Sequence, residues 1–449
     1  MELASRDRAG VRYNVGMNTP TNSDGFAVRV KTPQRDQVTM HFRSLEELLG
    51  SDHPVRNLWR YVCSLDLSGF YREIEAVQGG AGRDAVDPRI LLALWLYATV
   101  EGVSSARQLA ELCTRDFTYQ WICGEVGVNR DLLNSFRNRH PEALDALMTE
   151  TIGLLLHHDL VSLKRVAQDG MRVRASAGKS SFRRQATLEK HLAEARQQVE
   201  RMRQEGDDDA ARTRQEAARQ RAAQERLQRL EEAISQRQKL HEQKEQQKRN
   251  SGSEARSSTT DPEARTMKMA DGGFRPAYNV QFATAAGSRL IVGVAVTNEG
   301  GDSGQMEPMV TSLEEKFGQR PEEYLVDGGF SAREDTTLLE QRGVQVYSPI
   351  KKEQQLLEQG DDPYARRRGD SDEYYAYRQR MKTPEAKAIY KERSSTAEFP
   401  NAGCRNRGLQ QFPLRGLRKA RTIALWQALV HNFQMILYHG WLPLVCRGR

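Results

Sequence analysis

The sequence lacks the features that mark disulfide-linked, membrane-spanning and secreted proteins. Its five cysteines form no C-x-x-C pair and have no histidines at ligand spacing, which argues against a disulfide framework and a structural zinc site. The longest apolar run, residues 90–100, is interrupted only by Thr99 and has 11 residues, whereas a membrane-spanning helix needs ~20. Residues 1–26 contain no apolar stretch typical of a secretory signal. We therefore expect a soluble, cytoplasmic protein.

Acidic residues are missing from one end of the chain. No Asp or Glu follows Glu398, although the 449 residues as a whole carry 67 basic and 60 acidic side chains, a net charge of +7. This acid-free tail holds eight positive charges, at Arg405, Arg407, Arg415, Arg418, Lys419, Arg421, Arg447 and Arg449. The eight positive charges of the tail exceed the net charge of the whole chain, +7. This concentration predicts contact with a polyanion such as DNA. A solvated basic surface would give the same pattern.

The first part of the chain has helical patterning. Residues 1–38 show no hydrophobic periodicity and are expected to be a disordered leader, and residues 39–158 are expected to form an all-α N-terminal domain. Within it, one short helix follows Ser104, and another follows Asn129 and carries Arg137. This pair suits a DNA-binding helix-turn-helix, in which Arg137 would be exposed and would contact DNA. An ordinary helical bundle is the alternative.

The rest of the chain, residues 159–449, alternates between strand and helix patterns. Strands are expected at 161–169, 278–284, 290–296, 323–327 and 344–347, and helices at 305–317 and 332–341. Helical crossovers between strands predict an α/β fold with a mixed sheet.

A charged helical segment, residues 182–250, interrupts this pattern. Apolar residues follow the spacing of a coiled-coil seam at Leu188, Leu192, Ala195, Val199 and Met202, and again at Leu227, Leu230 and Ile234. We expect a coiled-coil helical hairpin with Gly206–Asp209 at its tip, followed by a flexible linker at 251–265. The hairpin would grip DNA or a second subunit, or would be a solvated spacer.

Three acids are candidates for the chemistry of this domain. Asp169 ends the first expected strand and Asp327 the fourth, and ligands of α/β sheets gather at the carboxyl ends of strands. Glu398 is the third candidate, with Glu392 as a weaker rival. Three carboxylates together would need divalent cations to offset their repulsion, and oxygen ligands favour Mg²⁺ or Mn²⁺. Two such ions would activate an attacking hydroxyl and stabilise the leaving oxygen of a phosphodiester.

Other polar residues are expected to be structural or solvated. Glu299, Asp302 and Glu307 surround glycines in a loop after a strand, where solvation is expected and a contribution to metal binding is the alternative. His431 belongs to an amphipathic helix and is expected to be packed rather than to act as a base.

Several stretches of the chain carry a family resemblance. In the α/β region they are VAQDGMRVRASAG, YNVQFATAAGSRLIVGVAVTNEGGDSGQMEPMV, YLVDGGFS and YKERSSTAEFPNAGCRNRGLQQFPLRGLRKARTIALWQALVHN. In the helical region they are DPRILLALWLYATVEGVSSARQLAELCTRDFTYQWICG and LLNSFRNRH. These stretches resemble DDE transposases of bacterial insertion sequences, in the IS4/IS5-like group and most closely the IS1182 type.

The resemblance implies an RNase H-like catalytic core that binds two Mg²⁺ ions, for which Mn²⁺ can substitute. The catalytic, metal-binding acids of the family fall on Asp169, Asp327 and Glu398. Its Tyr-Arg-Glu-Lys signature falls on Tyr390, Arg393, Glu398 and Arg405, with arginine in place of the lysine. Tyr390, Arg393 and Arg405 would contact DNA phosphates.

The activity implied by the resemblance is DNA transposition. Such an enzyme binds the terminal inverted repeats of its element, cuts them and joins their 3′-hydroxyl ends to target DNA, as a homodimer on the DNA. Pro400 and Gly403 lie between Glu398 and Arg405, and we expect the helix to bend there. A nuclease of the same fold that stops at hydrolysis, and a catalytically inert DNA-binding protein, remain the alternatives.

Overall fold

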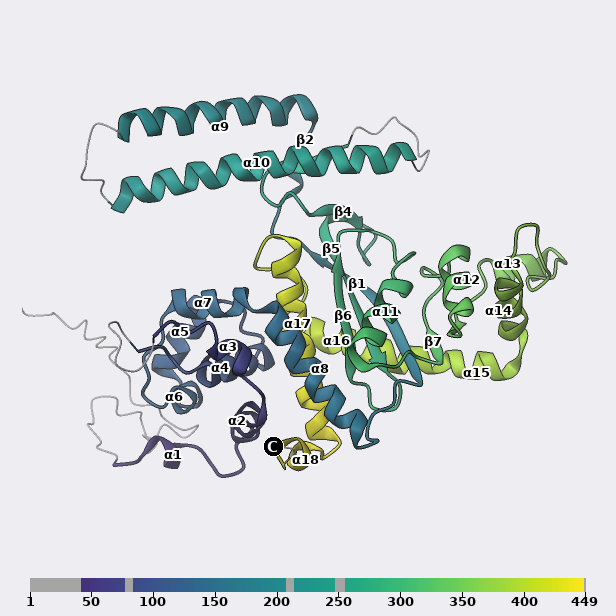
Figure 1. Ribbon diagram of the computed structural model, residues 1–449, viewed down its shortest axis with the longest axis horizontal. Helices are drawn as coiled ribbons and strands as arrows, with labels where there is room; N and C mark the ends of the chain where they lie inside the picture. The colour runs from purple at the N-terminus through teal and green to yellow at the C-terminus, as the bar shows by residue number, and fades with distance from the viewer. Residues whose placement is uncertain (1–41, 77–83, 207–213, 247–254, 448–449) are drawn as a thin grey trace, which may run out of the picture. The chain divides into compact units, whose positions relative to one another are not determined.

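The N-terminal part of the fold is helical, with ends that the sequence marks. The computed structural model describes residues 42–76, 84–206, 214–246 and 255–447 (Figure 1), so the expected leader at 1–38 lies outside the described residues. The helices before the first strand are α1 (Leu45–Leu48), α2 (Pro54–Ser64), α3 (Ser68–Tyr71), α4 (Pro88–Val100), α5 (Ala106–Arg115), α6 (Phe117–Cys123), α7 (Arg130–Arg139) and α8 (Pro141–His157). Ser105 caps α5 and Asn129 caps α7 by accepting backbone hydrogen bonds. The two short helices expected there are confirmed.

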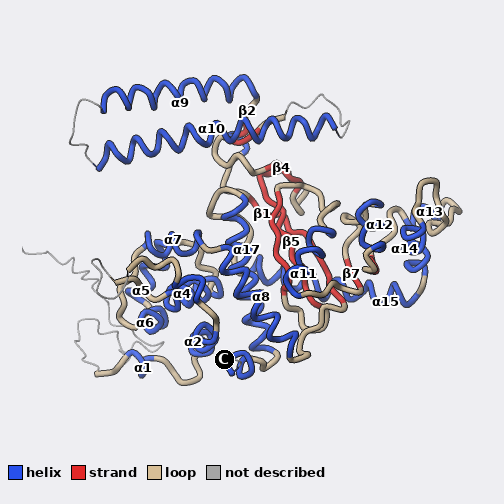
Figure 2. Tube along the Cα trace, viewed as in Figure 1, coloured by secondary structure: helices blue, strands red, loops and turns tan. Residues whose placement is uncertain are grey.

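A mixed sheet follows the helices (Figure 2). Its strands are β1 (Arg165–Arg174), β4 (Arg265–Lys268), β5 (Phe274–Ala285), β6 (Ile291–Thr297), β7 (Glu323–Leu325) and β8 (Gln345–Tyr347). The order across the sheet is β4-β5-β1-β7-β8, and β6 also pairs with β5. β5 is antiparallel to β1 and β6, whereas β7 runs parallel to β1 and β8. The predicted mixed α/β fold is confirmed.

The first strand is longer than expected. Asp169 was predicted to end it, but β1 continues to Arg174 because Gly170–Arg174 remain paired with β5, from Gln281 to Ala277. Asp169 therefore lies within the strand, and the pairing with β5 holds the backbone on both sides of it.

Helices connect and cover the later strands. They are α11 (Met306–Phe317), α12 (Arg333–Gln341), α13 (Glu353–Glu358), α14 (Asp372–Lys382), α15 (Pro384–Arg393), the π-helical turn η2 (Ser394–Glu398) and α16 (Phe399–Asn406). Residues 384–406 are helical throughout, so Pro400 does not interrupt the helix between Glu398 and Arg405. The π-helical turn η2 directly precedes α16, in which Pro400 lies.

The helix α17 (Leu417–Tyr438) joins the helical region to the sheet, and α18 (Leu442–Arg447) follows it. α17 packs against α4, α7 and α8 and also against β5 and β6. Residues Leu45–Arg449 form one compact unit, and one hydrophobic cluster runs through its helices and its sheet. Within the described ranges, no helix is both long and apolar enough to cross a membrane.

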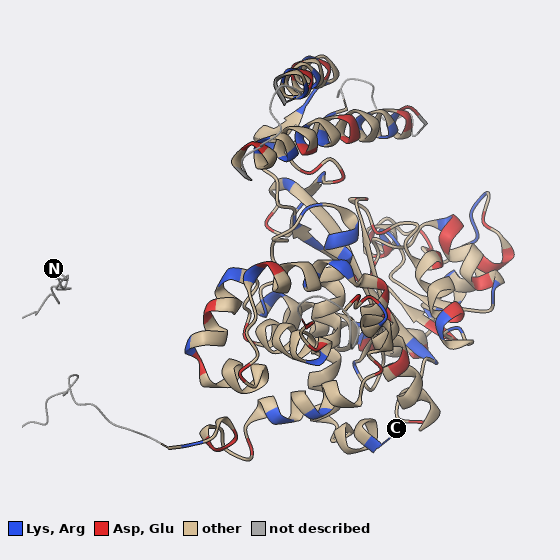
Figure 3. Ribbon diagram, turned by 60° about the vertical axis from the view of Figure 1, so that its left-hand side comes forward, with Lys and Arg blue, Asp and Glu red and all other residues tan. Residues whose placement is uncertain are grey.

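Two long helices, α9 (Gln185–Gly206) and α10 (Arg214–Gln246), pack against each other between β2 (Phe182–Arg183) and β3 (Ser257–Ser258). Basic and acidic residues are mixed along both helices (Figure 3). Their small core is separate from the main one and contains six of the expected seam residues, Leu188, Leu192, Ala195, Leu227, Leu230 and Ile234. The expected tip lies largely outside the described residues.

Residues 255–265, expected to belong to a flexible linker, are instead buried in the structure. Ser258 Oγ is 2.7 Å from Ser181 Oγ, and β3 pairs with β2. The Tyr278 hydroxyl donates to Asp261 Oδ1 at 2.6 Å. A serine-rich composition indicates solvation only when no distant partner is present, and here the partners lie far away in the sequence.

Candidate functional site

Asp169 and Asp327 lie at equivalent positions of two neighbouring parallel strands. In the pairing of β1 with β7, Ala167 is opposite Leu325, and each aspartate follows two residues later in its own chain. Because the two strands run in the same direction and in this register, the two aspartates follow their paired residues side by side, Asp169 within β1 and Asp327 just after β7. The negative charge of Asp327 is near enough to raise the pKa of Asp169. The sequence-based expectation that these two acids meet agrees with this geometry.

The third acid is brought to the same place by a helix with one unusual turn. Thr383 Oγ1 accepts a hydrogen bond from Ala386 N at 3.2 Å and caps α15, as the sequence predicted. After α15, η2 is a π-helical turn, which holds one residue more than an α-helical turn. Arg393 and Glu398 are therefore neighbours although they are five positions apart. Nη2 of Arg393 donates to Oε1 of Glu398 at 3.1 Å.

Arg393 connects the third acid to the sheet. Its Nη1 is 3.8 Å from Oδ1 of Asp169, on the other side of the guanidinium from Glu398. Tyr390, one turn earlier, is close enough for its phenol to interact with Arg393, Asp327 and Glu398. Arg393 and Tyr390 thus lie among the three acids.

The electrostatics of the site are dominated by burial. Burial raises the pKa of Asp169 to about 6, Arg393 opposes that rise, and Asp327 adds to it. Burial also raises the pKa of the Tyr390 phenol, again opposed by Arg393. Burial thus disfavours the charged forms of Asp169 and Tyr390, and Arg393 is the positive group that opposes this effect at both residues.

The chemical type of the possible ligand atoms at the site suits Mg²⁺ or Mn²⁺. Asp169, Asp327 and Glu398 offer carboxylate oxygens, which these ions prefer, and a cation would offset the buried charge of Asp169. Nowhere in the described part of the chain are three acidic, histidine or cysteine side chains arranged closely enough to hold an ion. In their place, the guanidinium of Arg393 lies between two of the acids. An ion that uses Asp169 and Glu398 together would have to displace Arg393.

Asn401 is a site residue that sequence reasoning missed. Its Nδ2 donates to Oδ2 of Asp169 at 2.7 Å, and this hydrogen bond lowers the pKa of Asp169. The side chain is buried, and its Oδ1 has no hydrogen-bond partner in the structure. The only signal in the sequence is its position three residues after Glu398, which places both residues on one side of a continuous helix.

The expected DNA-binding residues of the tail fall into two groups. Arg405, Arg415 and Lys419 are exposed. Arg407 instead donates to Gln427 and Gln434 of α17, and Arg418 pairs with Glu142 of α8 at 2.9 Å. Among the described residues, Arg405, Arg415 and Lys419 form no ion pair, and the pair of Arg418 lies in solvent, where such pairs are weak.

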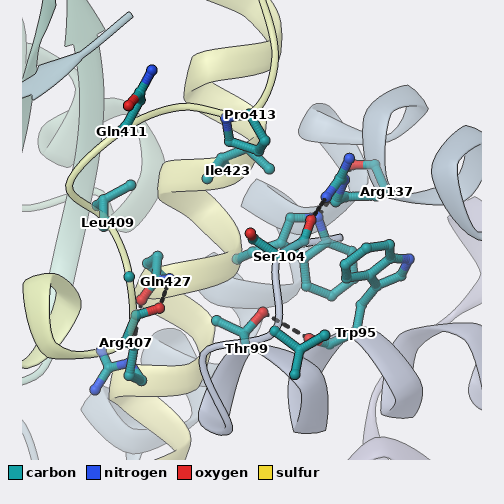
Figure 4. A pocket seen from close by; sticks show the side chains of 13 residues that line it. Trp95, Thr99, Ser104, Arg137, Arg407, Leu409, Gln411, Pro413, Ile423 and Gln427 are labelled. Atoms are coloured by element: carbon teal, nitrogen blue, oxygen red, sulfur yellow. Dashed lines mark hydrogen bonds between the residues drawn. The ribbon is translucent and has the colours of Figure 1, made fainter. Parts of the chain in front are cut away.

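Arg137 is buried, contrary to the expectation that it would be exposed. Its guanidinium lies over the ring of Trp95, 4.5 Å from the centroid, and donates to the carbonyl of Ser104. Burial lowers the pKa of Arg137 to about 10. The cause is the packing of α7 against α4, α5 and α17. Figure 4 shows Arg137 at the rim of a cavity that is otherwise lined mainly by α4, α17 and the segment 407–413.

The remaining candidates are also placed. Glu392 pairs with Arg165 at 2.7 Å, whereas Glu398 contacts Arg393, the residue that lies near Asp169. His431 is buried, with Nε2 2.8 Å from the carbonyl of Arg289, so the expectation of a packed histidine is confirmed. Asp302 is buried rather than solvated.

Comparison with known proteins gives two family matches. Residues 43–139 match a transposase domain (DUF772), and residues 240–433 match a transposase DDE domain. The second match contains Asp327, Tyr390, Arg393 and Glu398, whereas Asp169 precedes it. No curated protein and no solved structure matches the chain.

Proposed function

Because this chain belongs to the DDE transposases of bacterial insertion sequences, we propose that it cuts the ends of its own element and joins the 3′-hydroxyl ends to target DNA. The observation that supports this activity best is the convergence of Asp169, Asp327 and Glu398. Two adjacent strands and one helix supply these acids, and Arg393 lies between the first and the last.

We further propose that the catalytic region has an RNase H-like fold. Its support is the topology: three antiparallel strands, β1, β5 and β6, are followed by β7 and β8 parallel to β1, with helices as crossovers. This arrangement sets β7 beside the first part of β1, so that Asp327, two residues after β7, follows the same register as Asp169 within β1.

Asp169, Asp327 and Glu398 are the proposed ligands of two divalent cations. When bound, these ions would lower the pKa of the attacking hydroxyl and stabilise charge on the leaving oxygen. The chain's own groups orient the substrate: Asn401 holds the carboxylate of Asp169, and Arg393 and Tyr390 are placed to contact phosphate oxygens at the scissile bond. Arg405, which is exposed on α16, is a further proposed phosphate contact.

A cleavage and strand-transfer assay tests the activity. Purified protein is incubated with Mg²⁺, target DNA and a labelled duplex that carries the ends of its own element. We expect cut ends and joined products with wild type, none with Asp327→Asn, and both with Glu392→Gln, which removes a nearby acid that is outside the site. If wild type cuts the ends but does not join them, the protein is a nuclease and the transposase proposal is wrong. If it binds the ends but does not cut them in Mg²⁺ or Mn²⁺, it is a catalytically inert DNA-binding protein.

We propose that the protein acts on DNA as a homodimer at least, since two element ends must be held at once. Light scattering of the complex with end duplex should give two or more protein chains per complex. A strictly monomeric complex at micromolar concentration would contradict this prediction.

A further inference from the structure

A group of polar side chains is buried behind the carboxylate site. In the pairing of β1 with β5, Gly170 is opposite Gln281 and Arg172 is opposite Asn279. Because side chains alternate along a strand, these positions share one face of the sheet, and Asp169 belongs to the other. We call the group the back-face cluster; its members are Gln168, Arg172, Asn279, Gln281, Asp302 and Tyr324.

Asp302 is the charged centre of the back-face cluster. Its Oδ1 accepts hydrogen bonds from Asn279 Nδ2 at 2.7 Å and from Gln281 Nε2 at 2.8 Å. Its Oδ2 accepts one from Arg172 Nη2 at 2.6 Å. The side chain is 5 % exposed, because the loop after β6 folds back over the sheet. A buried carboxylate is stable only with such donors.

The hydrogen bonds continue from Asp302 to the strand that precedes Asp327. Gln281 Oε1 accepts from Gln168 Nε2 at 2.8 Å, and Gln168 Oε1 accepts from the Tyr324 hydroxyl at 2.6 Å. Gln168 directly precedes Asp169 on β1, and Tyr324 lies three residues before Asp327. One buried network therefore joins the two strands that carry the catalytic aspartates.

Two glycines show how closely Asp302 approaches the site. A Cβ atom on Gly170 would lie 2.2 Å from Oδ1 of Asp302, a distance that no real structure tolerates. A Cβ atom on Gly329 would lie 3.5 Å from Oδ2 of Asp302 and 2.9 Å from Oδ1 of Asp327. Asp302 thus packs against the backbone directly after Asp169 and just after Asp327.

We propose that Asp302 is a positioning residue for the cation-binding carboxylates of this transposase, an inference that rests on the proposed function. It does not bind the ions, because its oxygens are occupied by Asn279, Gln281 and Arg172. It fixes the separation of Asp169 and Asp327 through their backbones and through the back-face cluster. Buried hydrogen-bond networks of this kind are rigid, and loss of a group that orients metal ligands usually weakens metal binding about 10- to 100-fold.

Mn²⁺ binding by the full-length, DNA-free protein tests this proposal. Equilibrium dialysis would compare wild type with Asp302→Asn, which keeps the shape but puts an amide against the donors. We expect the dissociation constant to rise roughly tenfold or more. Tyr324→Phe removes only the hydroxyl that links β7 to Gln168, and should weaken binding in the same direction. If Asp302→Asn does not fold, the Mn²⁺ affinity of Tyr324→Phe tests the proposal by itself.

Asp335→Asn is the matched control. Asp335 is as buried as Asp302 and holds the same loop, through Gly304 N at 3.0 Å and Glu307 N at 3.4 Å, but it has no hydrogen bond to the back-face cluster among those described. If Asp302→Asn acts only by loosening the loop, Asp335→Asn should weaken Mn²⁺ binding as well. If Asp302 acts as we propose, Asp335→Asn should bind Mn²⁺ with the affinity of wild type.

A second readout separates positioning from folding. Asp302→Asn should need more Mg²⁺ for half-maximal cutting, bind the end duplex as wild type does in the absence of metal, and approach the wild-type rate at saturating Mg²⁺. If Asp302→Asn and Tyr324→Phe bind Mn²⁺ as tightly as wild type, the proposal is wrong while the proposed function stands. If wild type binds no Mn²⁺ and neither cuts nor joins the end duplex in Mg²⁺ or Mn²⁺, the proposed function fails and takes this inference with it.

Discussion

At the scale of single residues, we propose that Arg393 has two roles that follow each other in time. Without DNA and metal, its guanidinium offsets the charge of Asp169 and Glu398. The family resemblance gives it a phosphate contact, which it cannot make while it is held there. Entry of a cation would repel the guanidinium and release it toward the DNA.

Replacing Arg393 should therefore separate metal binding from catalysis. In Arg393→Gln, the positive charge that competes with the ion is lost, and we expect the DNA-free protein to bind Mn²⁺ roughly tenfold more tightly. Cutting should nevertheless become slower, because the phosphate contact is lost. Lys391→Gln removes an exposed positive charge two residues away and should change neither quantity. Weaker Mn²⁺ binding by Arg393→Gln, measured by equilibrium dialysis, would refute the competition.

A second prediction at this scale concerns His431. Burial lowers its pKa from 6.5 to about 4, so the folded protein favours the neutral ring. The resulting stability is fully present above pH 6.5 and is lost as the pH falls through 4. The loss amounts to about 3 kcal/mol.

His431→Gln keeps a donor for the carbonyl of Arg289 but does not titrate. Urea unfolding at several pH values should show that wild type loses more stability than this variant between pH 6.5 and 4. Equal pH dependence of the two proteins would mean that His431 is not buried in its neutral form.

At the scale of elements, the sequence predicted those helices and strands that have a local hydrophobic period or a local end signal. Alternation of apolar residues located β5 and β6, and the Thr383-Pro384 pair located the start of α15. The π-helical turn η2 was not predictable, because the residues of Ser394–Glu398 are also compatible with an α-helix. Two contacts accompany the turn: a local one between Arg393 and Glu398, and a tertiary one between Asn401 and Asp169 on the sheet, which the sequence does not reveal.

The packing of β1 against the Asp302 loop gives a prediction for glycine. Gly170→Ala would drive a Cβ into Oδ1 of Asp302 and, 2.6 Å away, Nε2 of Gln281, and we expect a loss of about 1–3 kcal/mol. Gly153→Ala, in helix α8 with open space around it, should instead stabilise the protein by up to ~1 kcal/mol. Urea unfolding measures both, and a neutral Gly170→Ala would mean that the loop moves freely.

Segments whose structure depends on residues far away in the chain could not be predicted from the sequence. Residues 255–265 have the composition of a linker, yet Asp261 is buried by Tyr278 and by the backbone of Gly416. The loop around Asp302 looks solvated for the same reason, since its donors come from two other strands. The neighbouring parallel strands of Asp169 and Asp327 were predictable from the strand and helix pattern, but the continuation of β1 past Asp169 was not. No such pattern marks Asn401 or Asp302.

At the scale of the whole molecule, one acid ties the helical region to the rest. Asp145 of α8 pairs with Lys316 of α11 at 2.7 Å and with Arg421 of α17 at 2.9 Å, and its side chain is 14 % exposed. Asp145→Asn leaves two cations without their partner, and we expect a loss of about 2–3 kcal/mol, less than for a fully buried pair because water reaches Arg421.

Glu142→Gln is the control for Asp145. Glu142 forms its pair with Arg418 in open solvent, so its loss should cost less than about 1 kcal/mol. Thermal or urea unfolding distinguishes the two. Similar losses in both variants would show that the burial of Asp145 contributes nothing.

The position of α17 also sets the timing of folding during synthesis. Asn432 on this helix exchanges two hydrogen bonds with Ile291 of β6, and Trp426 donates to the carbonyl of Arg137 on α7. On the ribosome, the helices of residues 45–157 and the strands emerge long before this helix, and their apolar surfaces stay open until it arrives. A message cut short before codon 417 would therefore yield a chain that chaperones and proteases recognise, and not a smaller DNA-binding protein.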